Sequence, residues 1–297
     1  LGAQPKQLYP SIPFQGLIIF FILSYFKLLK DINLFVKCTI LATRTLSIIH
    51  LLYEYSIEER KNMKTVVDKA SSRGYFNHGW LKTYHTFSFA NYYNPSRMHF
   101  GALRVLNDDS VAPSMGFDTH PHQNMEVISI PLKGYLRHGD SVKNTQTITP
   151  GDIQVMSTGK GIFHSEYNGS DKEQLEFLQI WIFPRIENTE PEYNNYDIRP
   201  LLKRNEPVLI ISPDGKVPAS IKQDAWFSMG TFDAGKSFEY KLHQEGNGVY
   251  IFIIEGDVKV ADNLLSKRDG IGLWDTKNFK VEVIQEATLL LMEVPMR

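Results

Sequence analysis

The sequence predicts an all-β protein of the sandwich or barrel class, for three reasons. From about Phe87 onward, short apolar alternations follow one another between Gly, Pro, Asn and Asp residues, as in EVISIPLKG and VYIFIIEGDVKV. Strands of this length and spacing are typical of sandwiches and barrels. Stretches with helical periodicity are missing from the same region, and one pattern of strands and glycine turns occurs twice.

Composition limits the classes of function. A chain of 297 residues with 42% apolar and 22% charged residues suits one large domain or two of ordinary size. The formal charge of -1 gives no general reason to expect nucleic acid or an anionic membrane as a partner. Cys38 is the single cysteine, so a disulfide framework and a thiolate metal cluster are excluded. A reducing compartment, the cytoplasm, is the expected location.

Residues 1–62 differ from the rest of the chain. They are rich in Ile, Leu and Phe, but their longest uncharged apolar run, 17–26, is shorter than the roughly 18 to 20 residues of a spanning helix. A fresh globular pattern starts at Met63 with MKTVVDKASSRGYF. We expect residues 1–62 to be an atypical extension translated from upstream of the natural start at Met63. A poor signal peptide or anchor, or a packed helical extension, are the alternatives.

The internal repeat divides the rest of the chain. IPLKGYLRHGD followed by TPGDIQVM resembles FIIEGDVKVADN followed by RDGIGLWD. The two copies meet near the proline- and asparagine-rich residues 184–200, which we interpret as a linker, with an ordered loop as the alternative. The expected domains are therefore 63–190 and 191–297, with no membrane span in either.

Two pairs of polar residues occur only in the first copy. His120 and His122 are two positions apart, so on a strand both imidazoles point to one side, and His164 and Glu166 have the same spacing. The aligned positions of the second copy carry Leu242, Gln244 and Val283. Three imidazoles and one carboxylate suit a divalent first-row metal, and six-coordinate iron would keep two positions open. We therefore predict a metal site in 63–190, with Fe(II) as the expected ion, and none in 191–297.

Other polar residues compete for these roles. Glu126 would lie roughly 13 Å along an unbroken strand from His122, so Glu166 is preferred as the fourth ligand and Glu126 is kept as a nearby partner or alternative. His138 is expected to be a turn or surface residue. A structural role in an aromatic layer over the core is expected for His78, His85 and His99.

The segment EFLQIWIFP alternates as a strand buried on both sides would. One face carries Phe177, Gln179, Trp181 and Phe183, and the other carries Leu178, Ile180 and Ile182. We interpret it as core and not as a cofactor site.

The stretch from HGWLKTYHTFSFANYY through GFDTHPHQNMEVISIPLKG to PGDIQVMSTGKGIFHSEYN closely resembles the pirin family, in particular bacterial pirin-like proteins of the quercetin 2,3-dioxygenase type. The resemblance runs from about Arg73 to the end of the chain. It implies a bicupin, in which two double-stranded β-helix (jelly-roll) barrels pack together. It also implies metal in the N-terminal barrel only, on His120, His122, His164 and Glu166.

The resemblance further implies a metal-dependent dioxygenase that opens the ring of a flavonol such as quercetin and releases carbon monoxide. The partners would be a flavonol-like aromatic molecule and dioxygen. Glu166, or else Glu126, would be the catalytic carboxylate that accepts the proton of the flavonol 3-hydroxyl. The alternative is a non-enzymatic metal-binding regulator that acts through a protein partner.

Overall fold

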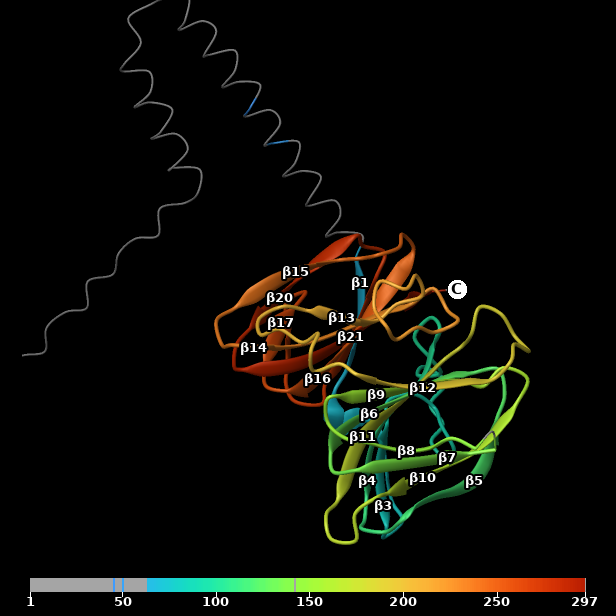
Figure 1. The fold of residues 1–297 in the computed structure, drawn as a ribbon. Helices are drawn as coiled ribbons and strands as arrows, with labels where there is room; N and C mark the ends of the chain where they lie inside the picture. The colour runs from blue at the N-terminus through green and yellow to red at the C-terminus, as the bar shows by residue number, and fades with distance from the viewer. Residues whose placement is uncertain (1–44, 46–49, 51–62, 142, 297) are drawn as a thin grey trace, which may run out of the picture. The chain divides into compact units, whose positions relative to one another are not determined.

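The computed structural model describes residues 45, 50, 63–141 and 143–296. The prediction that residues 1–62 are an atypical extension concerns residues that lie, apart from 45 and 50, outside this described part. Residues 63–141 and 143–296 form two β-barrels, coloured mainly green and mainly orange to red in Figure 1. Each barrel consists of a large sheet and a four-stranded sheet, and every pairing between named strands is antiparallel. The prediction of an all-β, two-barrel protein is confirmed.

The first barrel contains a seven-stranded and a four-stranded sheet. The seven-stranded sheet has the order β12 (Glu192–Asp197), β9 (Asp152–Ser157), β6 (Glu126–Lys133), β11 (Leu175–Ile182), β4 (Leu103–Val111), β3 (Leu81–His85) and β2 (Gly74–Asn77). The four-stranded sheet has the order β5 (Gly116–His122), β10 (Ile162–Asn168), β7 (Leu136–Asp140) and β8 (Thr145–Ile148).

The second barrel repeats this plan, with shorter strands in its four-stranded sheet. Its six-stranded sheet has the order β1 (Lys64–Asp68), β19 (Gly270–Trp274), β16 (Asn247–Glu255), β21 (Ala287–Pro295), β14 (Trp226–Phe232) and β13 (Val208–Ile211). Its four-stranded sheet has the order β15 (Ser237–Lys241), β20 (Asn278–Val283), β17 (Val258–Val260) and β18 (Asn263–Leu265). A single 3-10 turn, η1 (Ala70–Ser72), is the helical element of residues 63–141 and 143–296.

The two barrels exchange edge strands. β1 comes from the start of the first segment but pairs with β19 of the second barrel. β12 lies in the expected linker, 184–200, and pairs along its whole length with β9 of the first barrel. The linker is therefore ordered, as the alternative interpretation held. The division into domains 63–190 and 191–297 stays a prediction, because each segment gives one strand to the other barrel.

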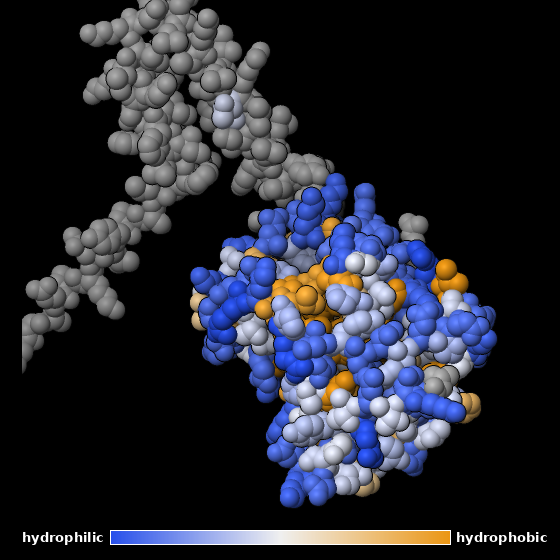
Figure 2. Space-filling view, in the orientation of Figure 1, coloured by the Kyte–Doolittle hydropathy of each residue, from blue (hydrophilic) through white to orange (hydrophobic). Residues whose placement is uncertain are grey.

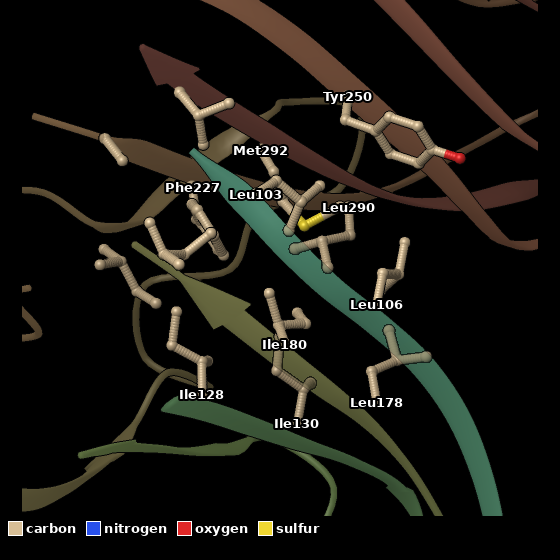
Figure 3. Close-up of a cluster of buried hydrophobic side chains, with 14 of the residues drawn as sticks. Leu103, Leu106, Ile128, Ile130, Leu178, Ile180, Phe227, Tyr250, Leu290 and Met292 are labelled. Atoms are coloured by element: carbon tan, nitrogen blue, oxygen red, sulfur yellow. The ribbon is translucent and has the colours of Figure 1, made fainter. Parts of the chain in front are cut away.

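The main hydrophobic core lies between the two large sheets. Figure 3 shows Leu103, Ile128 and Ile180 of the first barrel facing Phe227 and Leu290 of the second. Burying a side chain of this size contributes roughly 1.5 to 3 kcal/mol. The strand β11 is buried on both faces as predicted, since its even-numbered apolar residues join this core while Phe177 faces the interior of the first barrel.

One end of the first barrel is closed by apolar side chains. This cluster consists of Leu81, Val111, Leu136, Ile148, Leu175 and Phe177. Leu136 begins β7, whereas Asp140, at the other end of the strand, pairs with His164 of β10. The histidines therefore lie toward the opposite end of the barrel from this cluster.

The visible face of the described residues is mostly hydrophilic, with an apolar area over the second barrel (Figure 2). Among the described residues, no helix has the length and apolar character needed to span a membrane.

Candidate metal centre

The pairing of β5 with β10 brings three of the predicted site residues together. His164 lies opposite His120, and Ile162 lies opposite His122, so the three imidazoles share one face of the sheet. Their ring centroids are 4.4 to 4.8 Å apart, and the candidate ligand nitrogens all lie within 4.8 Å of one another. This three-histidine group is the one that could hold a metal ion among the residues that the structure describes.

The surroundings of His122 and His164 favour neutral imidazoles, which are the form that binds a metal. Burial lowers the pKa of His122 to about 4, and burial together with the neighbouring histidines lowers the pKa of His164 to about 2. The Nδ1 atom of His120 lies 2.7 Å from the backbone oxygen of Asp118, which can only accept, so Nδ1 carries the proton and Nε2 is free to bind a metal. Neutral imidazole suits iron, nickel, copper and zinc.

His164 supplies the clearest sign that a group is required here. It is 1% exposed, and both of its ring nitrogens are buried without a hydrogen-bond partner. Buried polar atoms in folded proteins nearly always have a partner, and a metal ion would satisfy one of these nitrogens. The residues present therefore fit a divalent first-row metal.

Glu166, the predicted fourth ligand, lies on β10 two residues after His164, with a break in the strand register between them. It is buried, its Oε1 accepts from Ser129 Oγ at 2.9 Å, and its Oε2 accepts from Gln179 Nε2 at 2.6 Å. Burial raises the pKa of Glu166 to about 7, against the opposite effect of these hydrogen bonds. Within the described residues its oxygens do not belong to the three-histidine group, so its role as a ligand stays a prediction.

Glu126, the alternative carboxylate, has a different set of contacts. Its Oε2 accepts from Ser157 Oγ at 2.6 Å and from the backbone N–H of Lys222 at 3.1 Å. Lys222 belongs to the segment that precedes β14 of the second barrel. Glu126 therefore connects the two halves of the chain, and it too lies outside the three-histidine group of the described residues.

The prediction that His138 is a turn or surface residue is wrong. It lies on β7 and is 1% exposed, with its ring centroid 5.3 Å from that of His164. Its Nε2 is 3.0 Å from Oδ2 of Asp140. The glycines on either side of YLRH suggested a turn, and only the inward alternation of Leu136 and His138 could have indicated a buried strand.

The expected structural role of His85 is confirmed. It is buried, with its ring 5.3 Å from that of Phe76 and 5.2 Å from that of Phe89. Burial lowers its pKa to about 4. His78 and His99 are exposed, with their rings 6.4 Å from that of Phe76 and 6.2 Å from that of Phe183, and neither belongs to the three-histidine group of the described residues.

Aromatic and apolar side chains surround the histidines. The Trp181 ring meets that of His122 edge-on at 4.7 Å, and Phe89 meets Trp181 at 5.2 Å. Tyr193, from β12, stacks on His138 at 4.1 Å. From the sequence, Trp181 is predicted as a core residue and Tyr193 as part of the linker. The sequence does not reveal that these two side chains lie beside the histidines. Flat apolar surfaces of this kind suit an aromatic ligand.

The second barrel has a buried polar cluster of its own, which the repeat comparison did not predict. Its centre is Glu293 on β21, whose oxygens accept from the backbone N–H groups of His243 and Gln244 and from the side chains of Tyr240 and Asn247. His243 follows the end of β15, and its Nδ1 is 3.0 Å from Oε2 of Glu293. Backbone and side-chain donors thus satisfy this carboxylate.

Comparisons with known proteins match both barrels to described families. Residues 66–182 match the family described as Pirin, and residues 209–294 match the family described as the quercetinase C-terminal cupin domain. The chain is 38% identical over 229 residues to a quercetin 2,3-dioxygenase of Escherichia coli (strain K12), covering 76% of this chain and 97% of the relative. It is 37% identical over 218 residues to a pirin-like protein of Caulobacter vibrioides, covering 73% of this chain and 93% of that protein.

A solved structure is similar over the same region. The crystal structure of the bacterial pirin YhhW in complex with nickel(II), from Escherichia coli, superimposes with a TM-score of 0.75 at 35% identity. The match covers 79% of this chain and 100% of that one.

Proposed function

The chain belongs to the pirin family, with two cupin barrels, and from this we propose that it is a metal-dependent dioxygenase that opens the ring of a flavonol such as quercetin and releases carbon monoxide. The observation that carries the proposal is the three-histidine group on β5 and β10, with the aromatic rings of Trp181 and Phe89 beside it. The relatives named quercetin 2,3-dioxygenase support the choice of substrate. The cytoplasm is the proposed location.

His120, His122 and His164 would hold the ion, with Glu166 as the fourth ligand. Fe(II) is the proposed metal, and the nickel-bound relative makes Ni(II) the first alternative to test. When bound, such an ion supplies Lewis-acid charge that favours the deprotonated form of the flavonol 3-hydroxyl. The chain's own part is to bind the flat ring system, orient its hydroxyl and receive the proton.

Glu166 is the proposed proton acceptor. Its raised pKa, about 7, places a carboxylate of useful basicity beside the histidines, and Ser129 and Gln179 fix the position of its two oxygens. Trp181 and Phe89 would offer apolar surface to the aromatic rings and keep bulk water away from the reacting atoms.

The test is anaerobic loading with Fe(II) or Ni(II), followed by oxygen uptake and carbon monoxide release with quercetin. The expected result is turnover by the wild-type protein and by a His78→Ala control, which changes an exposed histidine, but not by a His122→Ala, His164→Ala double variant. Full metal occupancy without turnover by the wild-type protein would contradict the proposal. It would favour a non-enzymatic metal-binding regulator that acts by binding a protein partner.

A further inference from the structure

His138 is held in one orientation by a fixed carboxylate. Its Nε2 lies 3.0 Å from Oδ2 of Asp140. The same oxygen accepts from Asn144 Nδ2 at 2.8 Å, and Oδ1 of Asp140 accepts from the backbone N–H of Asn144 at 3.0 Å. Since the carboxylate accepts, Nε2 of His138 donates, and in the neutral ring Nδ1 therefore carries a lone pair.

The ring of His138 is also held between two neighbours. Tyr193 stacks on it at 4.1 Å with an interplanar angle of 20°. His164 lies 5.3 Å away between centroids, tilted by 45°. In the pairing of β7 with β10, His138 lies opposite Glu166 and Asp140 lies opposite His164, so His138 and His164 are diagonal neighbours on the inner face of the sheet.

His138 and His164 have complementary unsatisfied atoms. Nδ1 of His138 and both ring nitrogens of His164 are buried without a hydrogen-bond partner. When one nitrogen of a histidine binds a metal, the other nitrogen carries a proton, and this N–H usually donates a hydrogen bond to a fixed acceptor. That hydrogen bond sets the orientation of the ring and raises the basicity of the metal-binding nitrogen. Nδ1 of His138 is a hydrogen-bond acceptor without a donor, and its ring lies beside that of His164.

We propose that, when a metal occupies the centre, the free ring N–H of His164 donates to Nδ1 of His138 while Nε2–H of His138 donates to Asp140. Asp140 and His138 would then position His164 and so set the metal affinity of the centre. The inference rests on the three-histidine metal site of the proposed function. It makes His138 a positioning residue that acts through His164, and it assigns a role to a buried pair that the proposed reaction does not use.

The test compares metal affinity in three variants. His138→Leu removes the lone pair at similar volume, His138→Gln keeps a side-chain acceptor, and His78→Leu changes an exposed histidine as the control. Competition against a chromophoric chelator gives the affinity for Co(II) and Ni(II), and the absorption spectrum of the Co(II) protein reports on the ligand field. Loss of an outer-sphere partner weakens metal binding by roughly 10- to 100-fold, which is the loss expected for His138→Leu.

His138→Gln is expected to recover part of this affinity, and His78→Leu to bind as the wild type does. Thermal unfolding of the metal-free proteins shows whether His138→Leu folds, and Asp140→Asn, which keeps the ring, takes its place if it does not. Wild-type affinity and an unchanged Co(II) spectrum in the folded variant would overturn the inference.

These measurements use no flavonol, so the two proposals fail separately. A wild-type protein that binds metal without turnover contradicts the dioxygenase proposal alone. A His138→Leu variant with undiminished metal affinity contradicts the positioning role alone.

Discussion

The hydroxyl of Tyr250, on β16, donates a hydrogen bond 2.8 Å long to Oδ2 of Asp68, on β1. The other oxygen of Asp68 pairs with Nη2 of Arg97 at 2.7 Å, and both Tyr250 and Asp68 are buried. Arg97 also donates to the backbone oxygen of Ser72, the last residue of η1. Tyr250 thus fixes the exchanged strand β1 to the second barrel, in addition to its pairing with β19, and Arg97 connects β1 to the loop between β3 and β4.

Replacing Tyr250 with Phe should lower the free energy of unfolding. The hydrogen bond to a charged acceptor is lost inside the protein, and such bonds contribute roughly 1.5 to 3 kcal/mol. Chemical denaturation followed by tryptophan fluorescence measures the change. Tyr93→Phe, at a position 74% exposed, is the matched control and should leave stability unchanged. Equal stability of the two variants would show that the contact does not hold β1 in place.

Replacing Glu293 with Gln should destabilise the second barrel. Burial raises the pKa of Glu293, but the hydrogen bonds from His243, Gln244 and Asn247 outweigh it and hold the pKa below its ordinary value. In the glutamine variant, the amide N–H groups would face the N–H donors that now bind the carboxylate, so some donors would lose their acceptor. Each buried donor left without an acceptor costs roughly 1 to 3 kcal/mol. Glu245→Gln, on the exposed neighbouring loop, is the control for the same denaturation measurement.

The sign of the pH dependence provides a second check on Glu293. Because its folded pKa is depressed, its contribution to stability is present above the ordinary glutamate pKa and is lost as the pH falls through the folded value. The difference between wild type and Glu293→Gln should therefore shrink at acid pH. A difference that stays constant down to the acid transition would mean that the charge of Glu293 does not contribute.

Asp109 should make the protein less stable as the pH rises. It is buried, its Oδ1 has no hydrogen-bond partner, and burial raises its pKa to about 7 although a hydrogen bond from Thr83 acts in the opposite direction. In the unfolded chain the carboxyl ionises near its ordinary pKa of 3.8. Between these two values the unfolded state loses a proton that the folded state keeps, so stability falls as the pH rises.

Asp109→Asn removes this effect. Relative to wild type, the variant should gain stability as the pH rises from 4 to 7, by several kcal/mol in total since one pKa unit corresponds to about 1.4 kcal/mol. Denaturation curves across this range measure the gain, with Asp171→Asn, on the surface, as the control. Parallel stability profiles for Asp109→Asn and wild type would rule out a raised pKa at this carboxyl.

Glu166→Gln should abolish most turnover of quercetin under metal saturation. The amide keeps the volume of the side chain but cannot accept the hydroxyl proton, and loss of a general base lowers rates by roughly 10²- to 10⁴-fold. Carbon monoxide release per bound metal is the measurement. Glu126→Gln is the matched control, because its carboxylate contacts Ser157 and Lys222, and it should retain turnover. Full activity of Glu166→Gln would exclude Glu166 as the proton acceptor.

The arrangement of His120, His122 and His164 could be predicted because it depends on local alternation and on a repeat whose second copy lacks these residues. The two-barrel fold followed from strand patterns of the same kind. His138, Tyr193 and the Glu293 cluster could not be predicted, because their environments arise from pairing between distant strands. Tyr193 faces the site only because β12 pairs with β9. His243 reaches Glu293 only because it lies beyond the end of β15.

The metal content of the protein, measured by elemental analysis after purification without added metal, directly tests whether His120, His122 and His164 hold an ion. We expect one divalent first-row ion per wild-type chain and loss of that ion in the His122→Ala, His164→Ala double variant, while the His78→Ala control keeps it. Metal content that is unchanged in the double variant would contradict the assignment of the three-histidine centre and the function proposed from it.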